Sequence, residues 1–217
     1  MNSRKFKCVI FDCDGVLVDS EIISNTVLVD MANTFGAKLN YDEALEMFRG
    51  KSMNLCLEII EARIKSPLPN DFEKNYRAQT ALAFKKDIQA VEGVKTLVEQ
   101  LKVPFCVASS GPEHKIKLNL SLTGLISHFE NKMFSCYGIQ KWKPDPGVFI
   151  WAAETMGFNI DECVVVEDTL TGVTAAKNGG FFTIGYSERD VNNTLISKAD
   201  VTFKTMAEVQ EFLNNHT

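Results

Sequence analysis

The sequence predicts an α/β protein in which helices cover both faces of a parallel sheet, and three observations support this prediction. Short apolar segments rich in β-branched and aromatic residues recur along the chain. These segments lack a clear alternation of apolar and polar residues, which is typical of strands buried on both faces of a sheet. Segments with helical periodicity lie between them, and this alternation of strand and helix indicates a Rossmann-like, doubly wound core.

Six strands are predicted for this core. The first strand, residues 5–11, ends directly before Asp12. Four further segments share its apolar, β-rich composition, and a weaker segment comes last in the chain: residues 103–108, 132–136, 162–166, 181–184 and 200–203.

Helices are predicted in three of the intervals between these strands, at residues 93–101, 145–156 and 169–178. Pro146 is expected in the first turn of the second helix and Gly157 at its end, because proline favours helix starts and glycine favours helix ends. Strand and helix therefore alternate through the second half of the chain.

The segment between the first strand and the first of these helices differs from the rest of the chain. It contains no convincing strand and is predicted to form several amphipathic helices, the first of which has regularly spaced apolar residues: Ile22, Ile23, Val27, Met31 and Phe35. A helical insertion of this length indicates a second domain. We therefore expect an α/β core formed by residues 1–19 and 90–217, and a small all-helical cap domain of residues 20–89 inserted after the first strand.

The composition excludes several classes of partner. The chain has 217 residues and a formal net charge of −5, so it offers no electrostatic attraction to nucleic acid or to an anionic membrane surface. No apolar run approaches the roughly 18 residues of a membrane span. The six cysteines are scattered without a C-x-x-C pair, and we expect buried free thiols in a reducing cytoplasm. A monomer is expected, although no sequence pattern addresses the oligomeric state.

Polar and charged residues follow four of the predicted strands at the point where each strand ends. In an open parallel sheet, ligands bind beyond the carboxyl ends of the strands, so these residues are the candidates for a functional site. If the four strands are neighbours, all of these side chains share one crevice. In chain order they are Asp12 and Asp14, then Ser109, Ser110 and Gly111, then Lys143, and then Glu167 and Asp168.

The residue types in this set indicate chemistry on a phosphoryl group. Several carboxylates in one crevice repel one another, and a hard divalent cation with oxygen ligands, above all Mg²⁺, relieves that repulsion. The Ser109 hydroxyl, the backbone N–H groups of residues 110–111 and the Lys143 ammonium suit phosphoryl oxygens. A metal ion, a carboxylate nucleophile and a phosphate cradle together predict phosphoryl transfer through an aspartyl-phosphate.

Each of these signals has a structural interpretation when it is taken alone. A D-x-D pair is common in turns. Glu167 and Asp168 could cap a helix that begins at Thr169, and a single lysine such as Lys143 is usually solvated. Four such signals in order, each at a predicted strand end, favour the functional interpretation.

These residues resemble a known family. The segments DCDGVLVDSE (from Asp12), VASS (containing Ser109), KPDP (from Lys143) and VVEDT (containing Asp168) resemble the four motifs of the haloacid-dehalogenase-like hydrolase superfamily. The resemblance covers essentially the whole chain, including a helical cap after the first motif. It is closest to the subgroup that contains β-phosphoglucomutase, phosphoglycolate phosphatase and sugar-phosphate phosphatases. Within that subgroup, the segments YGIQKWKPDP and YRAQTALAF look most like the bacterial 6-phosphogluconate phosphatase type.

The resemblance implies a role for each acidic residue of the motifs. Asp12 is the implied nucleophile and a metal ligand. Asp14 is the implied acid that protonates the leaving alcohol and then the base that activates water, and its backbone carbonyl also binds the metal. Asp168 is the implied third protein ligand, and Glu167 supports the metal directly or through water.

The remaining motif residues have implied supporting roles. Ser109, Ser110 and Lys143 would hold the phosphoryl oxygens, and Gly15 would allow the tight turn that directs both aspartates to one point. The cap would close over the site and exclude water during the first step. The presence of an aspartate at position 14 favours phosphate esters over the dehalogenase and phosphonatase chemistries of the family.

We therefore expect a Mg²⁺-dependent phosphate-monoester hydrolase acting on a small phosphorylated metabolite, a sugar or sugar-acid phosphate resembling 6-phosphogluconate. A β-phosphoglucomutase-like sugar phosphomutase is the alternative. It is disfavoured because the mutase subgroup has a histidine shortly after the first motif, where this chain has residues 21–25 (EIISN). Arg49 and Lys51 lie where the substrate-contacting loop of the cap is expected, and they would either bind a second anionic group or form a solvated basic turn.

Overall fold

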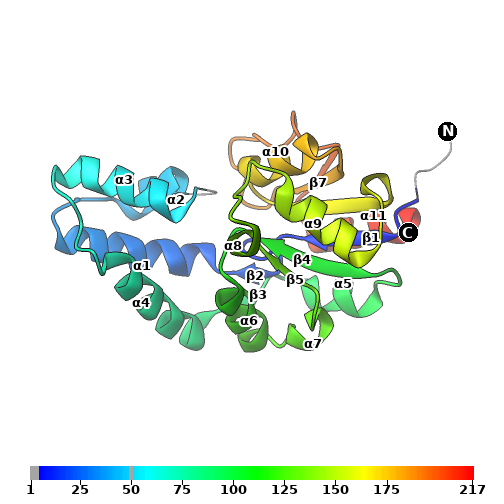
Figure 1. Ribbon diagram of the computed structural model, residues 1–217, viewed down its shortest axis with the longest axis horizontal. Coiled ribbons are helices and arrows are strands. Elements are labelled where there is room, and N and C mark those ends of the chain that lie inside the picture. Colours follow the sequence, from blue (N-terminus) through cyan, green and yellow to red (C-terminus); the bar gives the residue numbers. More distant parts are fainter. Residues whose placement is uncertain (1–4, 49–50) are drawn as a thin grey trace.

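The computed structural model describes residues 5–48 and 51–217, and it contains the predicted parallel sheet (Figure 1). Each of the six predicted segments contains or overlaps one strand of this sheet. The strands are β1 (Cys8–Phe11), β4 (Phe105–Ser109), β5 (Met133–Ser135), β6 (Cys163–Glu167), β7 (Phe182–Tyr186) and β8 (Val201–Phe203).

The strands are all parallel and lie in the order β5-β4-β1-β6-β7-β8. The first strand is therefore internal, and the chain winds outward from it first through β4 and β5 and then through β6, β7 and β8. This is the doubly wound arrangement that the sequence predicted. The winding direction reverses between β1 and β6, and ligands of such sheets bind at this point, beyond the carboxyl ends of the strands.

The helices of the core connect these strands. Each of the three helices predicted here is present, and each begins one or two residues later than predicted. The core helices are α5 (Val94–Gln100), α6 (Glu113–Leu122), α7 (Ile126–Phe129), α8 (Cys136–Ile139), α9 (Gly147–Met156), the short 3₁₀ helix η1 (Ile160–Glu162), α10 (Leu170–Asn178) and α11 (Met206–His216).

Helix α9 illustrates how local chemistry sets a helix boundary. Gly157 ends the helix as predicted, in a left-handed conformation with a φ of 82°. Pro146 was predicted in the first turn but lies directly before the helix. The side chain of Asp145 accepts a hydrogen bond from the backbone N–H of Gly147 at 2.7 Å, which satisfies a donor in the first turn of the helix.

Both faces of the sheet are apolar, because successive residues of a strand point to opposite faces. Cys8 and Ile10 of β1 are buried on one face, where they pack in one cluster with residues of α9 and α10. Val9 and Phe11 are buried on the other face together with residues of α5, α6 and α11. This two-sided burial explains why the strand segments show no alternation in the sequence.

The predicted helical cap is present (Figure 1). It has a hydrophobic cluster of its own. One expectation for its first helix was wrong: Ile22 and Phe35 are 50% and 45% exposed, although they were assigned to the apolar face. The first cap helix packs against both the second and the fourth helices of the cap. Its buried face therefore contains Leu28, Val29 and Ala32. The cap helices are α1 (Glu21–Thr34), α2 (Tyr41–Phe48), α3 (Met53–Ile64) and α4 (Phe72–Asp87).

A small antiparallel sheet that the sequence did not reveal joins the cap to the core. It consists of β2 (Val18–Asp19) and β3 (Gln89–Ala90), so the predicted domain boundary at residue 89 falls inside β3. The chain enters the cap directly after β2 and leaves it directly before β3. The guanidinium of Arg189 donates to both carboxylate oxygens of Asp19 at 2.7 and 2.6 Å, which fixes this connection to the core.

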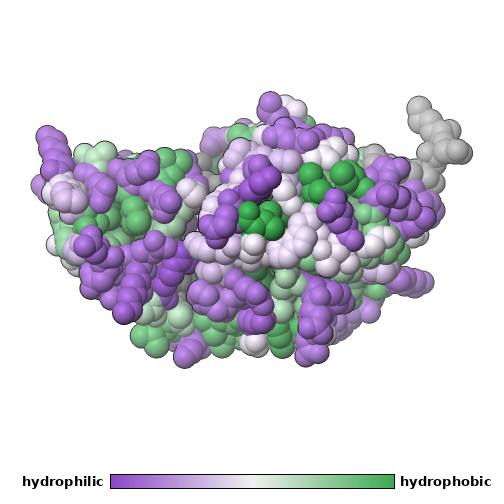
Figure 2. All heavy atoms as spheres, viewed as in Figure 1, coloured by the Kyte–Doolittle hydropathy of each residue, from purple (hydrophilic) through white to green (hydrophobic). Residues whose placement is uncertain are grey.

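Hydrophilic residues cover most of the face shown in Figure 2, and its apolar residues form separate patches. None of the described helices combines the length and the apolar character that a membrane crossing requires. All six cysteines are buried and free, as expected from their scattered positions.

Replacing Phe129 by alanine is expected to destabilise the fold by about 3–5 kcal/mol. Its ring is fully buried and makes edge-to-face contacts with Phe11 and Phe105, at centroid separations of 6.5 and 5.3 Å. The change in the free energy of unfolding is measured by urea denaturation monitored by circular dichroism. The control is Leu82→Ala, because Leu82 is 66% exposed. Equal unfolding free energies for the two variants would contradict this account of the core.

Candidate active site

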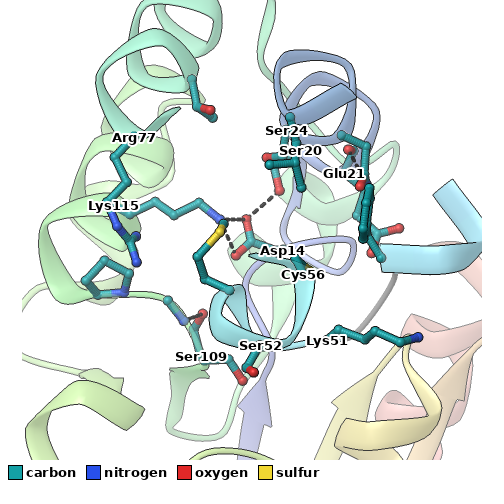
Figure 3. Close-up of a pocket in the computed structure, with 18 of the residues that line it drawn as sticks. Asp14, Ser20, Glu21, Ser24, Lys51, Ser52, Cys56, Arg77, Ser109 and Lys115 are labelled. Carbon is teal, nitrogen blue, oxygen red and sulfur yellow. Dashed lines mark hydrogen bonds and ion pairs between the residues drawn. The ribbon is translucent and has the colours of Figure 1, made fainter. Parts of the chain in front are cut away.

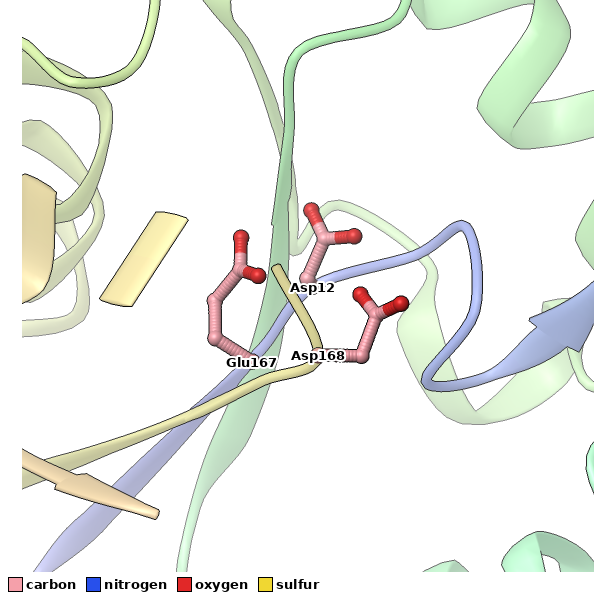
Figure 4. A group of neighbouring side chains, drawn as sticks. All are labelled: Asp12, Glu167 and Asp168. Carbon is pink, nitrogen blue, oxygen red and sulfur yellow. The ribbon is translucent and has the colours of Figure 1, made fainter. Parts of the chain in front are cut away.

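Three carboxylates meet at the carboxyl ends of β1 and β6, the two strands between which the winding reverses (Figure 4). They belong to Asp12, Glu167 and Asp168, and one oxygen from each lies within 4.8 Å of the other two. All three residues are buried. The strand register accounts for the cluster, because Phe11 pairs with Val166 and the residues that follow therefore lie side by side.

The ammonium of Lys143 lies inside this cluster. It contacts Oδ1 of Asp12 at 2.6 Å and Oε1 of Glu167 at 2.7 Å, and it donates to the backbone oxygen of Ala108 at 3.1 Å. Its side chain is only 4% exposed, so the interpretation of Lys143 as a solvated surface charge is wrong. The lysine therefore links the ends of three neighbouring strands, β4, β1 and β6.

Burial and charge act in opposite directions on these groups. Burial raises the pKa of Asp12 to about 7, although the neighbouring ammonium of Lys143 lowers it. Burial disfavours the charged form of Lys143, but the carboxylates of Asp12 and Glu167 outweigh this effect and raise its pKa. Lys143 is therefore a cation, and one cation cannot balance three carboxylates.

Two glycines make room for the carboxylates. Gly15 has a φ of 82°, as the predicted tight turn requires, and a Cβ atom there would lie 2.4 Å from an oxygen of Asp168. A Cβ atom at Gly172 would lie 1.8 Å from an oxygen of Glu167. The result is a compact, buried set of oxygen donors, which fits a hard divalent cation such as Mg²⁺.

Glu167 belongs to the carboxylate cluster and also binds Thr169, the residue that caps the following helix, α10. Its Oε2 accepts hydrogen bonds from the backbone N–H and the hydroxyl of Thr169, at 3.0 and 3.1 Å. Thr169 in turn caps α10 by accepting from the N–H of Gly172. The capping interpretation and the functional interpretation of this motif are thus compatible, because each uses a different oxygen of the same carboxylate.

Asp14 lies on the loop after β1, and its carboxylate contacts Lys115 and Ser20 (Figure 3). It also accepts a hydrogen bond from the side-chain amide of Asn119. Burial raises its pKa, but the ammonium of Lys115 and the hydroxyl of Ser20 outweigh burial, and the net effect is a lowered pKa. Asp14 is therefore held in its charged form. Cys13, between the two aspartates, is buried in the core cluster, so its interpretation as a packing residue is confirmed.

The end of β4 supplies the predicted serines. Ser109 is buried, and its Oγ accepts a hydrogen bond from the N–H of Gly111 at 3.0 Å. That N–H, which was expected to face a phosphoryl group, therefore already has a partner. Ser110 is exposed, and both serines line the cavity next to the carboxylates.

This cavity has a volume of ≈ 260 Å³ and lies between the core and the cap. Its size suits a small metabolite. Lys51 is exposed and lines the cavity, whereas Arg49 lies outside the described residues. Trp142 lines the cavity and also packs edge-to-face on Tyr137, at a centroid separation of 5.3 Å. The cap contributes, among others, Glu21, Ser24, Tyr76, Arg77 and Thr80 to the walls.

The sequence did not point to the residues that surround Asp14. Lys115 and Asn119 lie in α6; a helix was expected after residues 110–111, but neither its bounds nor these two side chains were predicted. Ser20 was interpreted only as part of the first motif. The spacing of four residues between Lys115 and Asn119 is the signal that could have been used, because it puts both side chains on one face of a helix.

Comparison with known proteins identifies relatives over nearly the whole chain. Residues 9–186 match the family model for haloacid dehalogenase-like hydrolases. The 6-phosphogluconate phosphatase of Escherichia coli strain K12 is 31% identical over 208 residues, which cover 95% of this chain and 94% of that protein. The phosphorylated carbohydrates phosphatase of Thermotoga maritima is 27% identical over 80% of this chain and 82% of its own length.

A solved structure supports the fold assignment. The crystal structure of a conserved haloacid dehalogenase-like protein of unknown function from Agrobacterium tumefaciens superposes with a TM-score of 0.85. The two chains are 27% identical, and the superposition covers 97% of this chain and 98% of that one. The similarity therefore includes both the sheet and the helical cap.

The variant Asp168→Asn is expected to bind Mg²⁺ at least tenfold more weakly, a loss of about 1.4 kcal/mol. The reason is that it removes one of the three carboxylates in the cluster. Isothermal titration calorimetry with Mg²⁺ measures the affinity. Asp87→Asn, at an exposed aspartate at the end of α4, is the matched control. Equal affinities for the two variants would show that Mg²⁺ binds elsewhere.

Proposed function

The chain belongs to the haloacid dehalogenase-like hydrolase family, and we propose that it is a Mg²⁺-dependent phosphatase of small sugar or sugar-acid phosphates. One observation carries this proposal: the buried cluster of Asp12, Glu167, Asp168 and Lys143 adjoins a small cavity that Asp14 also lines. The similarity of the chain to a 6-phosphogluconate phosphatase and to a phosphorylated carbohydrates phosphatase supports the proposed class of substrate.

In the first step, a carboxylate oxygen of Asp12 attacks the phosphorus atom in line with the leaving oxygen. The bond from phosphorus to the leaving oxygen breaks as the new bond forms, and the leaving oxygen takes a proton from Asp14. An incoming phosphoryl group brings negative charge close to Asp14, which favours the protonated form that this step requires. The products of the step are the free alcohol and an aspartyl-phosphate at Asp12.

In the second step, Asp14 accepts a proton from a water molecule, and the oxygen of that water attacks phosphorus. The bond between phosphorus and the Asp12 oxygen breaks, which releases inorganic phosphate and restores the carboxylate. Lys143 and Ser109 would hold the phosphoryl oxygens in both steps. The ammonium of Lys143 contacts Asp12 just beyond β1, and Ser109 is the last residue of the neighbouring strand β4. Ser110, on the cavity wall, is a further candidate for this contact.

Asp12, Asp168, Glu167 and the backbone carbonyl of Asp14 would hold the metal ion. When bound, Mg²⁺ supplies positive charge that stabilises the transition state and favours the ionised form of Asp12. The second effect matters because burial raises the pKa of Asp12 to about 7 in the protein alone.

The cap is proposed to act as a second domain that closes over the cavity. Its limits would be residues 20–89, with residues 1–19 and 90–217 forming the core, and the β2–β3 pair between them would serve as the hinge. Closure would exclude water while the aspartyl-phosphate forms.

The cap side of the cavity is proposed to determine the substrate. Lys51 offers a cation on that wall, and a sugar acid carries a carboxylate in addition to its phosphate. Arg49 is assigned the same role from its position in the sequence. The cavity also has room for the polyol chain of a sugar acid, beside hydroxyl groups such as those of Ser24 and Tyr76.

A sugar phosphomutase is less well supported. The described residues of α1 that line the cavity are Glu21, Ser24, Asn25 and Leu28, and none of them is the histidine of the mutase subgroup. Among the described residues, the cavity wall contains a histidine at His114, but this residue lies on the core helix α6. Release of phosphate faster than interconversion of isomers, after priming with a sugar bisphosphate, separates the two functions.

The proposed setting is the cytoplasm, where six buried free cysteines would remain reduced. The proposed form is a monomer acting on small metabolites, without nucleic acid as a partner.

Asp12→Asn is expected to reduce phosphate release by roughly 10³-fold or more, because the variant lacks the nucleophile. The measurement is release of inorganic phosphate from a panel that includes 6-phosphogluconate, glycolytic sugar phosphates and phosphoglycolate, with Mg²⁺ present. Removal of the metal with EDTA is expected to abolish the activity reversibly. Asp87→Asn serves as the control at an exposed aspartate. Full activity of Asp12→Asn or of metal-free protein would refute the proposal.

Lys51→Met is expected to raise the KM for 6-phosphogluconate by roughly tenfold, equivalent to about 1.4 kcal/mol of binding energy. The KM for glucose 6-phosphate, which lacks the carboxylate, is expected to stay unchanged. Steady-state kinetics with both substrates provide the comparison, and Lys74→Met, at an exposed lysine of α4, is the control. The same increase for both substrates would mean that Lys51 does not contact the carboxylate.

A further inference from the structure

The carboxylate of Asp14 is held by donors from two separate parts of the chain (Figure 3). The ammonium of Lys115 lies 2.9 Å from Oδ1 and 2.8 Å from Oδ2. Ser20, at the start of the cap, donates its hydroxyl to Oδ1, and the amide of Asn119 approaches the same oxygen at 3.4 Å. Lys115 contacts both oxygens, and it therefore restrains the rotation of the carboxylate about its own axis.

The packing of α6 places Lys115 at this point. Ile116 and Leu120 of α6 are buried in the core cluster on the sheet, which fixes the rotation of the helix. Asn119 is fully buried one turn beyond Lys115. Because residues four apart lie on one face of a helix, Lys115 and Asn119 present their donors together to the loop that carries Asp14.

The cap helix α4 covers Lys115 from the other side. The ammonium lies 5.8 Å from the centroid of the Phe84 ring, and α4 packs against α6. The side chains of Lys115 and Asp14 are 26% and 25% exposed, and both residues line the cavity. The ion pair therefore forms part of the cavity wall, next to the place where a leaving oxygen must lie to reach Asp14.

We propose that Lys115 is a positioning residue that holds the carboxylate of Asp14 in the orientation required for proton transfer to the leaving alcohol. This inference rests on the proposed phosphatase function and adds a residue from outside the four motifs. Without Lys115, the contacts that Ser20 and Asn119 make both reach the same oxygen, Oδ1, and the carboxylate is free to turn about it. The rate of proton transfer from Asp14 to the leaving oxygen then falls, whereas the contacts to the phosphoryl group do not change.

The dependence of the rate on the leaving group tests this role. An alkyl phosphate needs a proton on its leaving oxygen, whereas p-nitrophenyl phosphate releases a stable phenolate and needs little help from an acid. For Lys115→Met we expect the kcat for 6-phosphogluconate to fall by roughly 10- to 100-fold, part of the 10²–10⁴-fold that general acid–base catalysis contributes. The KM for 6-phosphogluconate and the kcat for p-nitrophenyl phosphate are expected to stay near their wild-type values.

Three further variants complete the experiment. Lys115→Arg keeps a cation with several donors, and it is expected to recover most of the lost activity. Lys117→Met is the matched control on the same helix, because Lys117 is exposed and pairs with Glu113. If Lys115→Met does not fold, Lys115→Gln gives the same comparison of leaving groups.

Equal losses of kcat for the two leaving groups, or a loss as large in Lys117→Met, would overturn the inference while leaving the proposed function intact. An inactive wild-type protein on both substrates would instead refute the proposed function and this inference with it.

Discussion

The rest of the site depends on the buried ion pairs that the ammonium of Lys143 forms with Asp12 and Glu167. Burying carboxylates without a partner is costly, and Lys143 meets this need by contacting both Asp12 and Glu167 while also binding the end of β4. It thereby fixes three strand ends relative to one another. Because one ammonium cannot balance the three carboxylates around it, the same arrangement that allows the chain to fold also attracts a cation.

The charges inside the cavity, and not the net charge of the protein, determine how an anionic substrate binds. The chain has a net charge of −5, so nothing in its overall charge favours a phosphate ester. The described residues of the cavity walls include four cations, Lys51, Arg77, Lys115 and Lys143, alongside the carboxylates of Asp12, Asp14, Glu21 and Glu167. Binding is therefore expected to depend on a few oriented groups and on the metal ion, and long-range attraction contributes little.

The fold and the motif residues could be predicted from the sequence because both follow from local patterns. A buried parallel strand is a short apolar run, and a polar residue directly after it, such as Asp12 or Asp168, must lie at the carboxyl edge of the sheet. Contacts that depend on the rotation of a helix could not be predicted in this way. The ion pair between Lys115 and Asp14 arises from how α6 packs on the sheet, and the exposure of Ile22 arises from how α1 packs on its two neighbours.

Asp12 is proposed to attack phosphorus itself and to form a covalent intermediate, and the stereochemical course of the reaction at phosphorus tests this role. A substrate whose phosphoryl group is made chiral with oxygen isotopes is hydrolysed, and the configuration of the released phosphate is determined. Two successive in-line displacements, first by Asp12 and then by water, predict overall retention of configuration. Inversion would mean that water attacks the substrate directly, and it would contradict the role assigned to Asp12.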